Sequence, residues 1–167
     1  MKACAAQDKI IMKIFTLKRN QVLPIGLTEA WSFFSDPGNL HLITPPELDL
    51  TITSPFAGAM HEGQIITYTV RPLLGVRVTW VSEITHIDKP RYFIDRQLAG
   101  PYKLWHHTHH FNEVNEGVEI VDMVYYALPT PIFDGIINKA FVENRLKYIF
   151  DFRAGRLKSQ FGGKRIS

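Results

Sequence analysis

Four of the chain's seven histidines fall within residues 104–111, which read LWHHTHHF. Side chains alternate between the two faces of a β-strand, so Trp105, His107, His109 and Phe111 would share one face. The opposite face would carry His106, Thr108 and His110. The two large rings indicate that the first face is buried, which would place two imidazoles inside the protein and leave the other two histidines in solvent.

Two carboxylates are candidates to meet these imidazoles. A two-residue tip at 115–116 would pair Val114 with Gly117 and set His109 directly opposite Asp122, whereas a three-residue tip would set Asp122 against His110. Asp122 shares its face with apolar residues of the following strand, so it would be buried. We expect a hydrogen bond to His109 or, failing that, to His107, because an unpaired buried carboxylate is costly. Asp95 shares a face with Phe93 and Gln97 on another strand, and the same parity could turn it inward.

Three kinds of chemistry are open to His107, His109, Asp122 and Asp95. Two imidazoles and a carboxylate could bind a metal. A His109–Asp122 pair could transfer a proton to or from a bound molecule. A buried hydrogen-bond network that satisfies itself and shapes a cavity is the simplest alternative, and the sequence favours it. No further residue at diagnostic metal-ligand spacing accompanies the two histidines, so we expect no tightly bound metal and no cofactor.

Composition narrows the class of protein. The 167 residues are 46% hydrophobic and 21% charged, which is typical of a folded single domain and excludes wholesale disorder. A single cysteine excludes an intramolecular disulfide and a multi-cysteine zinc site. The net charge is only +3 and the basic residues are scattered, so nucleic acid is not an expected partner.

The chain lacks an apolar run of the roughly 18 residues that a membrane span needs, and it lacks a secretory signal, so we expect a cytoplasmic protein without an integral membrane segment. Met12 is a second possible start of translation. We therefore expect an N-terminal extension at 1–12, one ligand-binding domain at 13–163 and a tail at 164–167. The oligomeric state is left open.

The elements that would position these side chains follow from periodicity. Alternating apolar residues predict strands at 13–23, 48–53, 64–71, 76–87, 92–98, 104–114 and 118–128. Helical spacing predicts a short helix from Gly26 to Phe34, a second short turn at 39–43, and a long helix at 131–161. The long helix would present an apolar stripe to the sheet, namely Ile136, Ala140, Phe141, Ile149 and Phe150.

This order of elements predicts an α+β helix-grip fold: a curved seven-stranded antiparallel sheet with two short helices and a long C-terminal helix. Four motifs then resemble a bacterial subgroup of the SRPBCC superfamily, which includes START-type lipid carriers and polyketide cyclases. They are NLHLITPP at 39–46, DxQxxGPY at 95–102, WxHxHxF at 105–111, and the stretch from Asp122 through Tyr126 to Pro129. The resemblance covers nearly all of the chain from about Met12 onward, and it favours an internal role for Asp95 and Gln97.

The function predicted from the fold and the resemblance is binding, as in lipid transport or sequestration, of a small hydrophobic molecule between the sheet and the long helix. The alternative is an enzyme similar to polyketide cyclases and dehydratases, with catalytic candidates His107, His109, Asp122 and Asp95. A partner-binding module is a third, weaker alternative. The candidate ligand-binding residues are mostly aromatic: Tyr68, Trp80, Phe93, Gln97, Tyr102, Trp105, His107, His109, Phe111, Tyr126 and Phe141.

Overall fold

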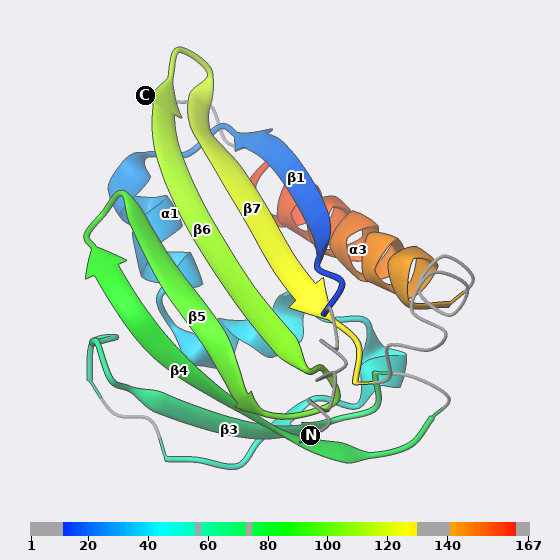
Figure 1. The fold of residues 1–167 in the computed structure, drawn as a ribbon. Coiled ribbons are helices and arrows are strands. Elements are labelled where there is room, and N and C mark those ends of the chain that lie inside the picture. Colours follow the sequence, from blue (N-terminus) through cyan, green and yellow to red (C-terminus); the bar gives the residue numbers. More distant parts are fainter. Residues whose placement is uncertain (1–11, 56–57, 73–74, 130–140, 163–167) are drawn as a thin grey trace, which may run out of the picture.

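A computed structural model of the chain describes residues 12–55, 58–72, 75–129 and 141–162 (Figure 1). A single antiparallel sheet has the strand order β1-β7-β6-β5-β4-β3-β2. Its strands are β1 (Phe15–Leu23), β2 (Thr51–Ile52), β3 (Ile65–Val70), β4 (Val78–Asp88), β5 (Tyr92–Ala99), β6 (Leu104–Val114) and β7 (Gly117–Ala127). The helices are α1 (Leu27–Phe34), the 3-10 helices η1 (Pro37–Ile43) and η2 (Pro46–Leu48), and the long α3 (Glu143–Phe161). The predicted helix-grip fold class is confirmed.

The β6–β7 hairpin has the two-residue tip. Val114 pairs with Gly117, and the register continues to the pair His109–Asp122. Gly117 has a φ of 132°, and a Cβ atom at this position would overlap the carbonyl oxygen of Leu23. A glycine is therefore required where the hairpin passes the end of β1, and this requirement helps to fix the register on which the buried face depends.

The sheet curves so that its concave face meets the described helices (Figure 1). Two register shifts interrupt the pairing of β4 with β5, one between Val81 and Ser82 and the other between Ile84 and His86. Such irregularities bend a strand and increase its twist. The bend leaves room between the sheet and α3 that a flat sheet would not leave.

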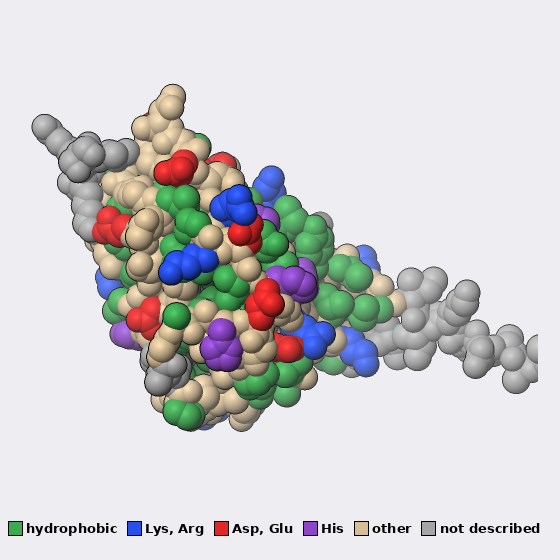
Figure 2. Space-filling model, turned by 90° about the vertical axis from the view of Figure 1, so that its left-hand side faces the viewer, with side chains coloured by type: hydrophobic (Ala, Val, Ile, Leu, Met, Phe, Trp, Pro, Cys, Tyr) green, Lys and Arg blue, Asp and Glu red, His purple; other side chains and the backbone are tan. Residues whose placement is uncertain are grey.

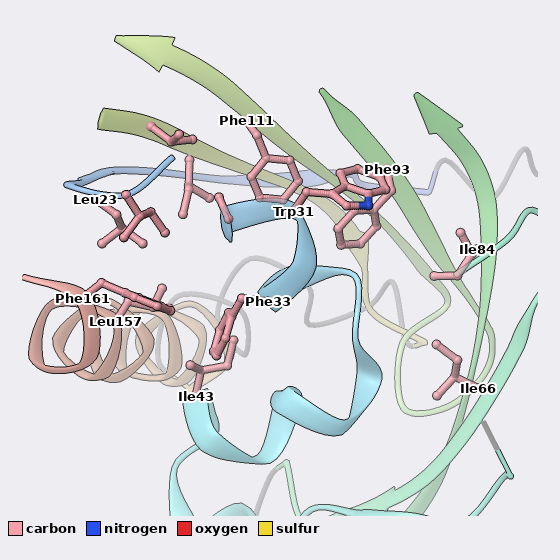
Figure 3. Close-up of a cluster of buried hydrophobic side chains, with 14 residues drawn as sticks. Leu23, Trp31, Phe33, Ile43, Ile66, Ile84, Phe93, Phe111, Leu157 and Phe161 are labelled. Carbon is pink, nitrogen blue, oxygen red and sulfur yellow. The ribbon is translucent and has the colours of Figure 1, made fainter. Parts of the chain in front are cut away.

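The hydrophobic core forms two clusters on the concave face. In the first, Trp31 of α1 meets Phe93 and Phe111 edge to face, with ring centroids 6.1 and 6.0 Å apart. Figure 3 shows this group beneath the sheet, with Leu157 and Phe161 of α3 joining from the other side. The second cluster packs earlier residues of α3 against β1, β4 and β7: its largest members are Trp80, Tyr102, Tyr126 and Phe150. The first cluster thus uses the C-terminal end of α3, and the second uses its N-terminal half.

The C-terminal helix corrects one sequence-based expectation. Phe141 was expected to face the sheet, but its side chain is 61% exposed and the adjacent Val142 is buried instead. Phe141 and Val142 are π-helical, and this wider turn changes which positions face the sheet relative to a regular α-helix. Ile149 and Phe150 do face inward, as predicted. The first part of the predicted helix, including Ile136 and Ala140, lies outside the described residues, as do most of the predicted N-terminal extension and the tail.

The strand predicted at 48–53 is also shorter in the structure. Only Thr51–Ile52 pairs with β3, and Leu48 belongs to η2. Pro46 begins this 3-10 turn, and Asp49 ends it in the left-handed conformation with a φ of 47°. These two residues take the backbone out of the extended conformation, so the apolar Leu48 is buried by a turn rather than by a strand.

The surface carries charges of both signs. On the face drawn in Figure 2, Lys and Arg side chains are interspersed with Asp and Glu. Among the described residues, no helix combines the length and the apolar character that crossing a membrane requires.

Candidate functional site

A cavity of about 200 Å³ lies between the concave face of the sheet and α3. Its wall is largely apolar and aromatic. The large rings of the wall are Phe33, Phe34, Tyr68, Trp80, Phe93, Tyr102, Trp105 and Phe150. The Ser82 hydroxyl in this wall accepts a hydrogen bond from Trp80 Nε1 at 3.0 Å and lies 3.4 Å from the Tyr68 hydroxyl. Because these polar atoms satisfy one another, this part of the wall behaves as an apolar surface.

Three neighbouring strands bring two imidazoles and two carboxylates together. His107 Nε2 donates to Asp122 Oδ1 at 3.0 Å, and His109 Nε2 donates to Asp95 Oδ2 at 2.8 Å. His109 Nδ1 is also 3.0 Å from Asp122 Oδ1, although without the alignment of a hydrogen bond, and His107 Nδ1 is 3.6 Å from Asp95 Oδ2. Each imidazole therefore lies between the same two carboxylates. Asp95, His107 and His109 line the cavity, whereas Asp122 lies behind them.

Burial and mutual contact shift the ionisation of all four groups. Burial alone would raise the pKa of Asp95 and of Asp122, but the contacts with the imidazoles outweigh it and lower both pKa values. Burial, together with the charge of His109, lowers the pKa of His107. Burial also opposes a charge on His109, but its contacts with Asp122 and Asp95 raise its pKa. Both carboxylates are therefore ionised at neutral pH, and His109 holds a proton more firmly than His107 does.

The structure brings most of the sequence-derived candidates to the cavity. Tyr68, Trp80, Phe93, Tyr102 and Trp105 line it, together with His107, His109 and Asp95. As predicted, Asp122 is hydrogen-bonded within the cluster, but to His107 rather than to the directly opposite His109.

Four other candidates lie away from the cavity wall. Phe111 is enclosed by Trp31 and other rings of the first core cluster, and Tyr126 packs among the rings of the second. The Gln97 amide is used locally, since it donates to the Tyr102 carbonyl at 2.7 Å and accepts from the Tyr102 N–H at 3.3 Å. Phe141 is exposed. The alternation of side chains along each strand therefore identified buried residues, but it could not distinguish residues of the core from residues of the cavity wall.

Arg153 is a cavity residue that the sequence reasoning missed. Its guanidinium lies over the Phe150 ring, 4.8 Å from the centroid, and borders the cavity. Its Nε is buried and has no hydrogen-bond partner among the described residues. A signal was available, because Arg153 lies three and four positions after the inward-facing Phe150 and Ile149 and so falls on the same helix face.

No family model matches the sequence, and no curated protein matches it at significant similarity. Solved structures do match. Ms6760 from Mycobacterium smegmatis has a TM-score of 0.62 at 17% identity, covering 87% of this chain and 92% of its own. TTHA0849 from Thermus thermophilus has a TM-score of 0.60 at 17% identity, and the match covers 89% of this chain and 99% of TTHA0849. Ara h 8.0201 has a TM-score of 0.56 at 15% identity, and the match covers 88% of this chain and 99% of Ara h 8.0201. At these identities the likeness shows the fold alone. The chain therefore shares the fold of these proteins, a curved antiparallel sheet closed by a long C-terminal helix.

Proposed function

We propose that this protein binds a small hydrophobic molecule in the cavity between the sheet and α3. The observation that carries the proposal is the wall itself, which is formed mainly by aromatic and aliphatic side chains around a volume of about 200 Å³. A preformed apolar cavity with a few polar groups at defined places is the usual form of a small-molecule site. SRPBCC proteins, which the chain resembles, bind varied apolar molecules, and this supports the same conclusion.

The polar groups of the wall favour a ligand that is not purely hydrocarbon. Arg153 borders the cavity with a buried Nε that lacks a hydrogen-bond partner among the described residues. A buried guanidinium N–H is stabilised when it donates to an acidic or other oxygen-bearing group. We therefore propose an apolar molecule that carries such a group and directs it toward Arg153. Lipid transport and a cytoplasmic location, both predicted from the sequence, stay predictions.

The cluster of His107, His109, Asp95 and Asp122 favours a second candidate function. Three of these groups face the cavity, where a bound molecule would meet them. An enzyme of the polyketide cyclase or dehydratase type, predicted from the sequence as the alternative, would use them to transfer a proton. Turnover separates the two candidates: a carrier releases its ligand unchanged, whereas an enzyme converts it.

Calorimetric titration with the neutral apolar probe N-phenyl-1-naphthylamine tests the binding proposal. Ile149→Trp adds volume to a residue that lines the cavity, and Tyr148→Trp makes a similar change at the neighbouring, 44% exposed position outside the cavity wall. We expect one binding site in the wild type, loss of at least tenfold in affinity in Ile149→Trp, and wild-type affinity in Tyr148→Trp. Equal affinity in all three folded proteins would overturn the proposal.

A further inference from the structure

Asp95, His107 and His109 have the arrangement of three ligands around one metal ion. One donor atom from each lies within 4.8 Å of the other two. Asp95 Oδ2 is 2.8 Å from His109 Nε2 and 3.6 Å from His107 Nδ1. An ion with bonds of about 2.0–2.2 Å holds neighbouring ligand atoms roughly 3.0–3.5 Å apart. Small side-chain adjustments would bring the three donors to one ion.

Asp122 occupies the position of an orienting group behind this triad. Its Oδ1 accepts from His107 Nε2 and is 3.0 Å from His109 Nδ1, so it contacts the nitrogen of each imidazole that faces away from Asp95. In metal sites the second nitrogen of a ligating histidine usually donates to a carboxylate, which fixes the tautomer and the ring orientation. A small turn of the His109 ring would align its Nδ1–H with Asp122, so that one carboxylate serves both histidines; His109 Nε2, which donates to Asp95 in the structure, would then be the ligand atom.

Charge and access support the same assignment. Histidines that ligate a metal are deprotonated, so Asp95 and Asp122 would then place two negative charges in the buried cluster. Arg153 offsets one of these charges, and a metal cation would offset the other. The three ligands line the cavity, whereas Asp122 does not. The side of the ion opposite the triad would therefore face the cavity and remain open to water or to an oxygen atom of a bound molecule.

We propose that Asp95, His107 and His109 bind one divalent first-row transition-metal ion, with Asp122 as a positioning residue. Two imidazoles and a carboxylate are a donor set that suits Zn²⁺, Fe²⁺ and Co²⁺ better than Mg²⁺ or Ca²⁺. The sequence alone argued against a metal because no third ligand had diagnostic spacing. Pairing of Asp95 with His107 across β5 and β6 supplies this ligand from a separate strand.

The test uses untagged protein from which a chelator and dialysis have removed all metal. One sample is titrated with Co²⁺ and followed by visible absorption, and a second is titrated with Zn²⁺ and followed by calorimetry. We expect one equivalent of each to bind, and the absorption of a nitrogen- and oxygen-coordinated Co²⁺ to appear. Asp95→Asn and His109→Ala should each weaken Zn²⁺ binding at least a hundredfold, and Asp122→Asn tenfold to a hundredfold. His106→Ala and His110→Ala are the matched controls, because they remove histidines from the opposite face of the same strand.

A second measurement avoids variants that fail to fold. Crystals of the wild type grown with ZnCl₂ should give an anomalous peak at the zinc edge within bonding distance of Asp95, His107 and His109. Absence of stoichiometric binding by the folded wild type, a peak elsewhere, or equal losses in the control variants would overturn the proposal. The naphthyl-probe titration needs no metal, so this site can fail while the proposed function stands, and the reverse also holds.

Discussion

The imidazoles of His107 and His109 lie against each other, with ring centroids 3.7 Å apart and ring planes inclined by 39°. The two residues share one face of β6, and Phe93 stacks on the outer side of His109 at 4.1 Å. Burial and the charge of His109 lower the pKa of His107, and each ring is held by a hydrogen bond to a carboxylate on one side or the other. Asp95 and Asp122 come from the two strands that flank β6.

Replacement of Asp122 tests what these carboxylates contribute to stability. In metal-free protein, Asp122→Asn removes the charge that faces both imidazoles, and we expect the free energy of unfolding to fall by about 1–3 kcal/mol. Urea denaturation measures the change. Asp88→Asn is the control, because it breaks a solvent-exposed pair with Arg91, for which we expect a much smaller effect. Equal losses in the two variants would show that the buried cluster does not stabilise the fold.

Truncation of a buried and of an exposed aromatic ring should change the free energy of unfolding by very different amounts. Phe111 is 2% exposed and packs against Trp31, whereas Phe141 is 61% exposed. We expect Phe111→Ala to lower the free energy of unfolding by about 3–5 kcal/mol. Phe141→Ala should change it by less than about 0.5 kcal/mol. A large loss in Phe141→Ala, measured by the same urea denaturation, would restore the original expectation that this ring packs on the sheet.

Substitution by alanine should change the stability of the protein in opposite directions at two glycines. Gly117 has a positive φ and no space for a Cβ atom, so Gly117→Ala should destabilise the protein by about 1–3 kcal/mol. Gly155 is exposed within α3 and has nothing within 4 Å of an added Cβ, so Gly155→Ala should stabilise it by about 0.5–1 kcal/mol. Thermal unfolding of both variants checks the signs. A neutral Gly117→Ala would mean that the hairpin tip adapts easily.

Arg153 should distinguish charged ligands from neutral ones. If its guanidinium meets an acidic group, Arg153→Met should weaken binding of the anionic probe 1-anilinonaphthalene-8-sulfonate by roughly tenfold to a hundredfold, as expected for one charge-assisted hydrogen bond. The neutral N-phenyl-1-naphthylamine should bind with nearly unchanged affinity. Fluorescence titration of both probes against both proteins gives the comparison. Equal weakening of the two probes would show that Arg153 shapes the cavity and does not select charge.

The sequence predicted the parts of this molecule that depend on local periodicity. Alternation on β6 identified the buried pair His107 and His109, and this inference succeeds because strand parity is set within a few residues. The register of these histidines against Asp122 was left open between a two-residue and a three-residue tip, and the structure has the two-residue tip.

The parts that the sequence did not predict depend on contacts distant along the chain. Phe111 and Trp105 have the same parity, but only Trp105 reaches the cavity, because α1 brings Trp31 against Phe111. Helical spacing places Arg153 on the same face of α3 as Ile149 and Phe150, but its position beside a cavity depends on how α3 packs on the sheet. The convergence of Asp95 on His109 likewise depends on how β5 pairs with β6.

A crystal structure of the wild type saturated with N-phenyl-1-naphthylamine tests the central claim most directly. The account predicts electron density for the probe between the sheet and α3, in contact with Trp80, Trp105 and Ile149. Density for the probe only on the outer surface, with the cavity walls collapsed onto one another, would contradict the proposal that this fold encloses a binding site.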